Sequence, residues 1–429
     1  MKITNVNIYC EDHTFRRGSV HVEHGRIAAF FMDENEEVGD DQAVSEDRRS
    51  SAFRNRNEGQ GDKDYENENH ANENHEIYDG KGAYLIPGLI DIHFHGCMGI
   101  DFCDALPDGL AQMAAYEASV GVTSICPASM TMSKEELHGI MKMAGEYEEQ
   151  KIDEYKDAQK EIQTDGYAKK SHFVGINMEG PFISEAMKGA QAEENIIPCD
   201  VEFFRQLQEE SGGKIRLVDI APEEAGAMEF IEELADEVNI SIAHTQSDYD
   251  TAMEAFSKGT RHVTHLYNAM TPLHHRNPGV IAAAADSHAE VEIICDGIHV
   301  HPSIVRNTFR MFDADKICLI SDSMRATGLS DGEYTLGGQK VYVKGALATL
   351  EDGTIAGSVT NLMDCMKNVV QKMGIPLETA IACATENPAK CIGIFDEYGS
   401  ITIGKHADLV LLDEELKVLD VFVDGEKVK

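Results

Sequence analysis

The sequence predicts an α/β protein: a (β/α)₈ TIM-like barrel joined to a small β-sandwich domain that both chain termini build. Three observations support this prediction. Eight short apolar runs alternate with amphipathic stretches between residues 85 and 321, a pattern typical of parallel strands separated by helices. Both ends of the chain have strand-like runs separated by turn residues. The length of 429 residues suits one barrel plus a small second domain.

The eight apolar runs are the candidate barrel strands. They are nearly continuous in apolar residues, as expected of strands buried on both faces, and the segments between them carry apolar residues at helical spacing. Eight such units are the number that closes a (β/α)₈ barrel, although an open doubly wound sheet has the same alternation. The runs cover residues 89–93, 122–126, 173–178, 215–220, 240–243, 262–265, 291–295 and 316–321.

Strand-like runs at both chain ends predict the smaller domain. The first thirty residues contain three such runs, with Gly25 as the turn between the last two. The segment ITIGKHADLVLLDEELKVLDVFVDGEKV at 401–428 contains three more. Since the middle of the chain has a different pattern, we expect the two ends to meet in one β-sandwich. The expected division is residues 1–84 and 396–429 for the sandwich and 85–395 for the barrel.

Three segments depart from these patterns. An acidic low-complexity insertion at 33–76 has no hydrophobic period, which predicts a solvated segment without a core. A charged tract at 146–166 predicts a solvated extension of the helix that follows the second run. After the eighth run, residues 333–358 predict a hairpin over the barrel mouth.

The charge balance excludes two classes of partner. The chain has 76 acidic residues against 37 Lys and Arg, a formal charge of −39, so neither nucleic acid nor an anionic membrane is expected to bind. The ten cysteines are scattered without a CxxC pair, and the chain start has no signal-peptide pattern. Together these features predict free thiols in the cytoplasm. No apolar run of about 18 residues is present, so no membrane span is expected.

Ionisable residues at strand ends are the candidate functional groups. Barrel enzymes place catalytic groups at the carboxyl ends of their strands. Five of the eight runs end in such a group, and the first ends in an HxH pair whose imidazoles share one face of a strand. The second, fourth and seventh runs do not. The six residues are His93, His95, Glu179, His244, His265 and Asp322.

Each of these residues alone has an ordinary explanation. A histidine at a strand end is commonly a hydrogen-bonded loop residue, Glu179 before Gly180-Pro181 fits a turn, and Asp322 fits a helix cap. Their coincidence on one rim predicts a metal site instead, because so many buried charges need a cation. Imidazole and carboxylate ligands suit Zn²⁺ or Fe²⁺. Such a metal lowers the pKa of bound water toward about 7, and Asp322 would accept the water proton.

These motifs resemble those of the amidohydrolase superfamily, and in particular the N-acetylglucosamine-6-phosphate deacetylase family. The resemblance covers nearly the whole chain apart from the two charged insertions. HLYNAM with EGPF and SDSM is specific as a set, whereas HxH alone would indicate only the superfamily. The motifs are PGLIDIHFHG (87–96), GVTSICPASMT (121–131), MEGPFIS (178–184), KGAQ (188–191), AHT (243–245), THLYNAMTPLHHR (264–276), DGIHV (296–300) and SDSM (321–324).

The resemblance implies a role for each candidate residue. Asp322 corresponds to the catalytic base and acid, and His299 to a residue that donates to the scissile amide oxygen, unless it is an ordinary loop histidine. His93 and His95 match a pair that only some family members keep, and their presence permits a second metal bridged by Glu179. The ligands of the principal metal are expected at Glu179, His244 and His265.

The resemblance also implies a binding site for an amino-sugar phosphate. Arg276 corresponds to an arginine that reaches the neighbouring subunit's site, which implies a homodimer in which a guanidinium clamps the phosphate. His274 and His275 either assist it or are ordinary loop residues. Gln191 stands where many relatives carry histidine, so its contact stays open. The expected substrate contacts are Ala190, Gln191, Asn268, Ala269, Arg276, His299, Ile355, Ala356 and Gly357.

The implied reaction is the hydrolysis of N-acetyl-D-glucosamine 6-phosphate to D-glucosamine 6-phosphate and acetate in amino-sugar catabolism or recycling, with metal-bound water as the nucleophile. Two alternatives stay open. One is an amidohydrolase for another N-acyl sugar phosphate, such as N-acetylgalactosamine 6-phosphate, or for an N-acyl amino acid. The other is a non-catalytic barrel scaffold, although such scaffolds usually lose metal ligands and no ligand is missing here.

Overall fold

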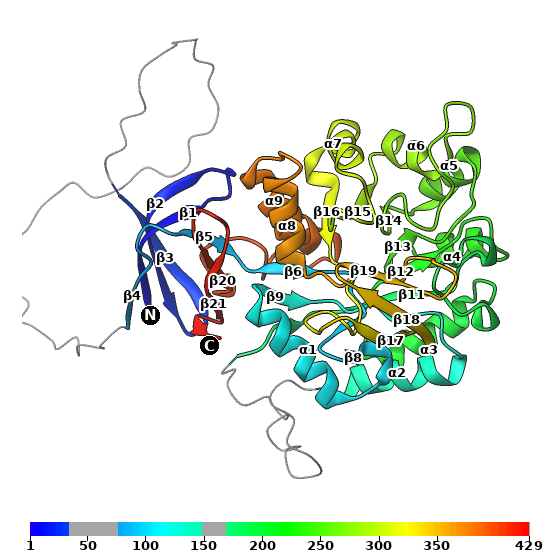
Figure 1. Cartoon of the computed structure of the whole chain (residues 1–429), viewed down its shortest axis with the longest axis horizontal. Coiled ribbons are helices and arrows are strands. Elements are labelled where there is room, and N and C mark those ends of the chain that lie inside the picture. Colours follow the sequence, from blue (N-terminus) through cyan, green and yellow to red (C-terminus); the bar gives the residue numbers. More distant parts are fainter. Residues whose placement is uncertain (34–75, 148–168, 429) are drawn as a thin grey trace, which may run out of the picture.

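The computed structural model describes residues 1–33, 76–147 and 169–428. A sheet that contains both termini lies on the left of Figure 1, and a larger α/β domain lies on the right. The predicted acidic insertion at 33–76 and most of the charged tract at 146–166 fall outside the described residues. Helix α2 (Lys134–Glu146) ends where that tract begins, and Tyr147 already has extended backbone. Glu146, the first residue of the tract, thus belongs to α2, and the rest of the predicted extension beyond Tyr147 lies outside the described residues.

All eight predicted strands are present in the α/β domain, and the third run is divided into β10 and β11. They form a six-stranded parallel sheet in the order β11-β12-β13-β14-β15-β16 and a three-stranded parallel sheet in the order β10-β9-β6. The strands are β6 (Leu89–Asp91), β9 (Val122–Ile125), β10 (His172–Phe173), β11 (Ile176–Phe182), β12 (Ile215–Ile220), β13 (Asn239–Ile242), β14 (His262–Val263), β15 (Glu290–Ile294) and β16 (Ile317–Ile320).

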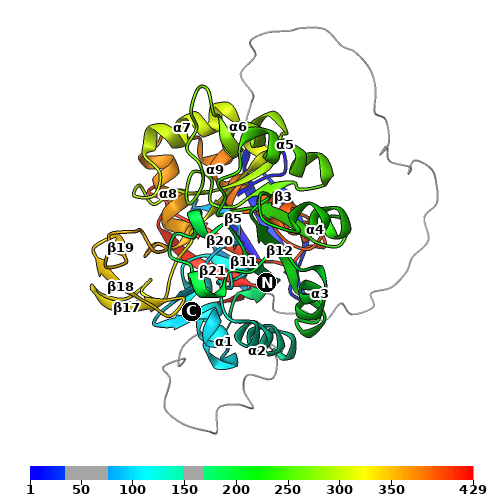
Figure 2. The ribbon, with the colours of Figure 1, turned by 90° about the vertical axis from the view of Figure 1, so that its right-hand side faces the viewer.

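Backbone hydrogen bonds join these two sheets at both of their edges. Ser129 N, just beyond β9, donates to Asn177 O of β11 over 2.9 Å, and Asp322 N, just beyond β16, donates to His93 O over 2.9 Å. Helices surround the strands in the view of Figure 2. The domain is therefore a TIM-barrel-like α/β domain.

Polar caps in the sequence set the starts of several surrounding helices. Ser133 and Glu136 form a capping box at the start of α2. The side chains of Asp200, Asp248 and Asn361 each accept a backbone N–H in the first turn of α3, α5 and α8, respectively. The other helices are α1 (Pro107–Ser119), α3 (Val201–Glu210), α4 (Ala227–Leu234), α5 (Tyr249–Lys258), α6 (Gly279–Asp286), α7 (Pro302–Met311), α8 (Leu362–Gln371), α9 (Leu377–Ala384) and α10 (Glu386–Cys391).

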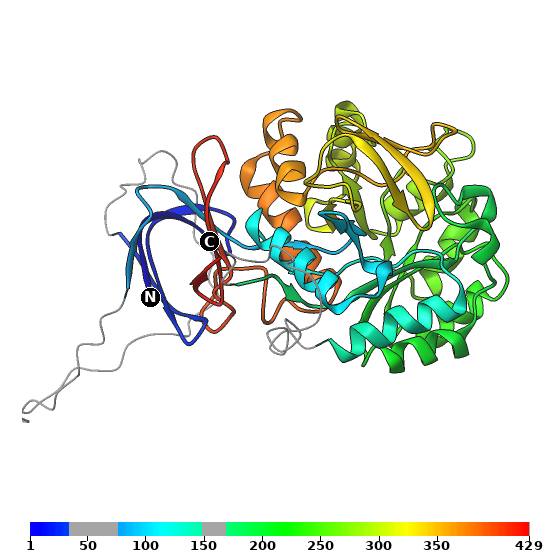
Figure 3. The ribbon, with the colours of Figure 1, turned by 60° about the horizontal axis from the view of Figure 1, so that its bottom comes forward.

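The small domain is one curled, hydrogen-bonded sheet (Figure 3), and both chain ends contribute to it as predicted. Its path is β22-β21-β20-β5-β1-β2-β3, and β4 pairs with β1. The three C-terminal strands therefore lie side by side and join the N-terminal strands where β20 pairs with β5. The sequence indicates the strands but not the register that joins them. The strands are β1 (Lys2–Tyr9), β2 (Phe15–Glu23), β3 (Arg26–Met32), β4 (Ile77–Asp79), β5 (Tyr84–Pro87), β20 (Leu409–Leu412), β21 (Val418–Val423) and β22 (Glu426–Lys427).

Strand β20 divides its side chains between two cores. Leu409 and Leu411 pack into the core of the small domain, whereas Val410 and Leu412 pack into the core of the α/β domain. All four side chains are buried. The alternation of side chains along a strand thus lets one apolar run close one domain and attach it to the other.

The predicted hairpin after the eighth strand is a three-stranded antiparallel unit. It consists of β17 (Gly332–Leu336), β18 (Gln339–Lys344) and β19 (Leu347–Thr349). A two-stranded ribbon, β7 (Gly96–Cys97) with β8 (Ile100–Asp101), follows the HxH motif. Among the described helices, none combines the length and the apolar character that crossing a bilayer requires.

Candidate metal and active site

Glu179, His244 and His265 converge on one point at the carboxyl ends of their strands. His244 Nε2 lies 2.9 Å and His265 Nε2 lies 3.2 Å from Glu179 Oε1. The two Nε2 atoms are themselves 3.1 Å apart. All three residues are buried. Residues that are 65 and 86 positions distant from Glu179 in the chain are thus brought together as the sequence predicts.

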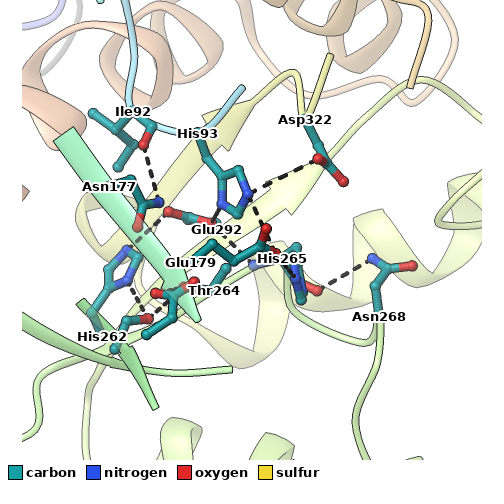
Figure 4. A network of polar contacts seen from close by, with 12 residues as sticks. Ile92, His93, Asn177, Glu179, His262, Thr264, His265, Asn268, Glu292 and Asp322 are labelled. Atoms are coloured by element: carbon teal, nitrogen blue, oxygen red, sulfur yellow. Dashed lines mark hydrogen bonds and ion pairs between the residues drawn. The ribbon is translucent and has the colours of Figure 1, made fainter. Parts of the chain in front are cut away.

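His93 and Asp322 join the same cluster from the ends of the first and eighth strands (Figure 4), and His95 lies beside them. His95 Nε2 lies 3.4 Å from Glu179 Oε2 and 3.3 Å from Asp322 Oδ1. His93 Nε2 lies 3.7 Å from Glu179 Oε1 and 3.9 Å from Asp322 Oδ1. Glu179 Oε1 therefore faces the imidazoles of His244, His265 and His93, and Oε2 faces that of His95.

The backbone at three of these strand ends adopts the left-handed region. The φ angles are +42° at His244, +31° at His265 and +50° at Asp322, a conformation that costs a non-glycine residue about 1–2 kcal/mol. Gly180, at φ +82°, follows Glu179, and a Cβ there would lie 2.1 Å from Thr131 Oγ1. Such strain at two ligand positions and at Asp322 indicates that the tertiary structure holds these residues in place for a function.

Hydrogen bonds to the far side of two imidazoles select the nitrogen that faces the cluster. His244 Nδ1 donates to Met187 O over 2.9 Å, since a carbonyl can only accept. His93 Nδ1 lies 2.9 Å from Glu292 Oε2, a carboxylate oxygen. In both residues a neutral ring would then present the Nε2 lone pair to a cation bound beside Glu179. This is the arrangement that second-layer groups impose on metal-binding histidines.

Oppositely charged neighbours determine the direction of the pKa shifts in the cluster. Burial would raise the pKa of Glu179, yet hydrogen bonds from His244 and His265 hold this pKa well below its usual value. Burial likewise opposes ionisation of His93, but Glu292 and Glu179 raise the pKa of this imidazole well above its usual value. The pKa of Asp322 is lowered despite burial, chiefly by its hydrogen bond with His95. The carboxylates are therefore ionised at neutral pH and attract positive charge.

A divalent metal fits this donor set. Two Nε2 atoms and one carboxylate oxygen converge within hydrogen-bonding distance, and His93 Nε2 is buried without a hydrogen-bond partner. The ligand atoms of Glu179, His244 and His265 lie within 4.8 Å of one another, as do those of His93, His95 and Glu179. Nitrogen and oxygen donors without thiolates are typical of Zn²⁺, Fe²⁺ and similar ions.

A pocket of about 400 Å³ opens directly over the cluster. Met130 and Leu336 supply apolar surface, and Thr354 a hydroxyl. Leu336 and Thr354 belong to the region of the predicted hairpin, so this unit does lie over the mouth. The predicted site residues that line the pocket are His95, Glu179, Ala190, Gln191, His244, His265, Asn268, Ala269, His299, Asp322, Ile355 and Gly357.

His299 is oriented toward the pocket by its neighbour Asp296. His299 Nδ1 lies 2.7 Å from Asp296 Oδ2, and the backbone N–H of His299 also donates to that carboxylate. Burial opposes charge on His299, but Asp296 raises the pKa of the imidazole. The raised pKa favours the imidazolium, whose Nδ1–H donates to Asp296 and whose Nε2–H is then available as a donor on the pocket side.

Gln191 contacts the metal-site carboxylate. Its Nε2 donates to Glu179 Oε2 over 2.7 Å, and its Oε1 accepts from Thr131 N over 2.7 Å. Gln191 is 2% exposed. The amide is thus engaged on both sides by groups of this chain.

Two predicted substrate contacts lie outside the pocket. Ala356 is fully buried and packs beneath the pocket between Ile355 and Gly357, against Leu336 and Met324. Arg276 is exposed on the loop after His275 and does not line this chain's own pocket. This exposed position is the one expected of an arginine that reaches the pocket of a neighbouring subunit. The guanidinium of Arg276 does not line the pocket of its own chain.

Two buried acids that support the site lie inside strands rather than at their ends. Glu292 of β15 contacts His93 and accepts from His265 N over 3.1 Å. Asp219 of β12 accepts from Thr264 Oγ1 over 2.8 Å, and burial raises its pKa to about 7. The sequence does contain a signal for Glu292 and Asp219, because each is an acid within an otherwise apolar run. An examination of the strand ends alone overlooks them.

The comparisons with known proteins agree with this geometry. The sequence profile described as "Amidohydrolase family" matches residues 84–428. The chain therefore belongs to the amidohydrolase family.

Within that family the chain is similar to proteins named N-acetylglucosamine-6-phosphate deacetylase. The Bacillus subtilis protein of this name is 40% identical over 346 residues, which cover 80% of this chain and 84% of the relative. An Escherichia coli O157:H7 protein named N-acetylgalactosamine-6-phosphate deacetylase is 32% identical over 344 residues, with 80% and 87% covered.

Solved structures are similar over the entire length. The N-acetylglucosamine-6-phosphate deacetylase of Pasteurella multocida has a TM-score of 0.81 at 26% identity, with 99% of this chain and 98% of that chain covered. A variant of the Mycobacterium smegmatis deacetylase in complex with N-acetyl-D-glucosamine-6-phosphate has a TM-score of 0.80 at 27% identity, with 100% and 99% covered.

Proposed function

We propose that this chain hydrolyses N-acetyl-D-glucosamine 6-phosphate to D-glucosamine 6-phosphate and acetate, a reaction of amino-sugar catabolism or recycling. The observation that carries the proposal is the buried Glu179–His244–His265 cluster with Asp322 at the base of a 400 Å³ pocket, in a chain 40% identical to a deacetylase of this name. A pocket of this size holds a monosaccharide phosphate.

Glu179, His244 and His265 are the proposed ligands of a principal metal, and we propose Zn²⁺ or Fe²⁺. His93 and His95, which lie 3.7 Å from Oε1 and 3.4 Å from Oε2 of Glu179, are the proposed ligands of a second ion. When bound, such an ion supplies a Lewis acid that polarises the amide carbonyl and lowers the pKa of water. Gln191 already donates to Glu179 Oε2, so the second site requires this oxygen to be shared.

Asp322 is the proposed general base and acid. Its lowered pKa keeps the carboxylate ionised at neutral pH, so it takes a proton from the attacking water. When the C–N bond breaks, Asp322 returns that proton to the departing amine. His299, held by Asp296, donates from Nε2 to the oxyanion that forms on the acetamide oxygen.

The remaining proposed contacts hold the sugar phosphate. Asn268, Ala269 and Ala190 line the pocket, and Ile355, Ala356 and Gly357 form the loop that closes over the ligand. Arg276 is proposed to reach the pocket of a second subunit in a homodimer, since it lies on an exposed loop. A guanidinium there offsets the strongly acidic chain for an anionic substrate.

The proposal also includes the closure of the barrel, the division into domains and the cellular compartment. The hydrogen bonds at both edges of the two parallel sheets support a closed eight-stranded barrel. The packing of β20 into both cores supports the division into residues 1–84 with 396–429 and residues 85–395. All ten cysteines are free thiols, which supports a reducing compartment and hence the cytoplasm.

Acetate-release kinetics on four substrates test the function. We expect kcat/KM to be highest for N-acetylglucosamine 6-phosphate and much lower for unphosphorylated N-acetylglucosamine, with metal content measured on the same sample. N-acetylgalactosamine 6-phosphate tests the alternative, which similarity to the Escherichia coli protein favours. An N-acyl amino acid serves as the unrelated control. A preference for the galactosamine epimer would replace the proposed substrate, and no acetate release from any metal-loaded sample would reject the proposal.

A further inference from the structure

A second cluster of metal-binding side chains lies near the amino ends of the barrel strands. His262 begins β14, Cys318 is the second residue of β16, and Cys391 is the last residue of α10. The imidazole nitrogen and the two thiol sulfurs lie within 4.8 Å of one another. The exposed fractions are 0%, 1% and 7%, so the cluster is sealed from solvent.

The surroundings of this cluster are apolar. Cys318 and Cys391 pack with a set of aliphatic side chains that includes Ile320, Ala389 and Ile392. An imidazole and two thiols in such surroundings are poorly solvated, and a buried polar atom without a partner costs about 1–3 kcal/mol. His262 Nε2 is such an atom, because it makes no hydrogen bond among the described residues.

A chain of hydrogen bonds fixes the tautomer of His262. Thr264 Oγ1 donates its proton to Asp219 Oδ1 over 2.8 Å. Ser241 Oγ therefore donates to Thr264 Oγ1 over 2.6 Å, and its own lone pair accepts from His262 Nδ1 over 2.9 Å. With its proton on Nδ1, the neutral ring directs the Nε2 lone pair at the two thiols. Figure 4 shows His262 beside Thr264 and beneath Glu292.

The donor atoms of this cluster match a zinc site. Two thiol sulfurs and one imidazole nitrogen meet at one buried point. Thiolate sulfur and imidazole nitrogen are the donors that structural zinc sites use. The rim cluster around Glu179, by contrast, contains no sulfur.

We propose that His262, Cys318 and Cys391 form a structural site for a thiophilic divalent ion, Zn²⁺, separate from the catalytic centre. Zinc–sulfur and zinc–nitrogen bonds of about 2.3 and 2.0–2.1 Å require donor separations of roughly 3.5–4 Å, which small side-chain rotations reach from the observed cluster. Two thiolates balance the ion's charge in this apolar interior.

A fourth donor is available in Glu292. Its Oε1 lies 3.9 Å from His262 Nε2 and has no hydrogen-bond partner among the described residues, while its Oε2 stays with His93. Bound zinc would fasten α10, which leads to the C-terminal part of the small domain, to strands β14 and β16.

Cobalt substitution of the full chain tests the proposal. Thiolate ligands give Co²⁺ a near-ultraviolet charge-transfer absorption that nitrogen and oxygen ligands do not, so the rim cluster is silent in this measurement. We expect the absorption in the metal-free, reduced protein on adding Co²⁺, its loss on adding Zn²⁺, and its loss in Cys391→Ala. Cys126→Ala is the matched control, because Cys126 is buried in the same apolar cluster but is no ligand.

Three results would overturn the proposal. They are no thiolate–cobalt absorption in the unaltered protein, an undiminished absorption in Cys391→Ala, and a Cys318–Cys391 disulfide found by mass spectrometry of the protein purified without reductant. The first result needs no variant, so it stands even where Cys391→Ala fails to fold. Acetate release by each variant, measured in parallel, reports whether the fold is intact.

Discussion

The two ends of the barrel-like domain use histidine in opposite ways, and β14 serves both. His265, just beyond this strand, directs Nε2 at Glu179 in a pocket open to substrate. His262, three residues earlier, directs Nε2 at two thiols in a sealed apolar core. The residue type is the same and the burial is similar. Access to a pocket and the identity of the facing donors distinguish a candidate reaction centre from a candidate structural site.

Glu292 lies between these two ends. One carboxylate oxygen contacts His93 at 2.9 Å, and the other lies 3.9 Å from His262. Burial would raise the pKa of Glu292, but His93 and His262 lower it. A single buried acid thus orients groups of both clusters, so the two ends are separable in function but not independent in structure.

The largest expected effect is at the rim, in Asp322→Asn. An amide cannot accept the water proton, so kcat is expected to fall about 10²–10⁴-fold, while the metal bound per chain stays unchanged. Steady-state kinetics with metal analysis measures both quantities. Asp250→Asn, on the exposed surface of α5, is the control and should retain full activity. An Asp322→Asn enzyme with normal kcat would remove Asp322 from the role of base.

Arg276→Ala tests whether the rim is completed by a second subunit. Loss of a charge-assisted contact to phosphate is expected to raise KM for N-acetylglucosamine 6-phosphate roughly tenfold or more, with little change for N-acetylglucosamine. Arg306→Ala on the exposed face of α7 is the matched control. Equal effects of Arg276→Ala on both substrates would contradict a phosphate clamp.

Glu292→Gln tests the group between the two ends. Removal of a second-layer carboxylate typically weakens metal binding 10- to 100-fold, and we expect this loss of Zn²⁺ affinity at the rim. Competition with a chelator of known affinity measures it. Glu290→Gln, two residues earlier on β15 and half-buried, is the control. Unchanged affinity in Glu292→Gln would show that His93 needs no orientation by Glu292.

The pH dependence of metal stabilisation follows from the raised pKa values of His93, His95 and His244. Between the ordinary histidine pKa of about 6.5 and these higher values, the folded metal-free chain holds protons that the unfolded chain has released. This part of its stability is present below about pH 6.5 and declines as the pH rises. Metal binding displaces the same protons and strengthens with pH.

Scanning calorimetry with and without Zn²⁺ checks this sign. The rise in Tm on adding Zn²⁺ is expected to increase between about pH 6 and pH 8. A rise in Tm that shrinks over this range would mean that the imidazoles are neutral before metal binds.

The smallest expected effect on turnover is at the sealed end. Cys391→Ala should leave kcat and KM within about twofold, because Cys391 contacts neither the pocket nor Glu179, and most changes remote from a reaction centre act on stability instead. Its Tm is expected to fall relative to Cys126→Ala when Zn²⁺ is present. A large loss of kcat in a folded Cys391→Ala enzyme would show that the two ends are coupled in catalysis.

Much of the site was predictable because parallel strands bring their carboxyl ends together. Once the runs ending at Glu179, His244, His265 and Asp322 are recognised as neighbouring strands, their convergence follows from topology. The same reasoning could not find Glu292 or Asp219, because an acid inside a strand has a partner only when the opposite wall of the barrel is known. It also leaves the contacts of Gln191 undetermined, because the two residues that contact this amide, Glu179 and Thr131, lie in other segments of the chain.

The sequence by itself determined the strands, the small terminal domain and the ligand types at the rim, because periodicity and side-chain chemistry are local properties. Tertiary structure alone decided that the small domain is one curled sheet, that Ala356 lies beneath the pocket, and that His262, Cys318 and Cys391 meet. These outcomes depend on register and on contacts between distant residues, such as Leu409 and Pro87, 322 positions apart, and His262 and Cys391, 129 positions apart. No local pattern encodes such distances, since packing selects them only when the whole chain is folded.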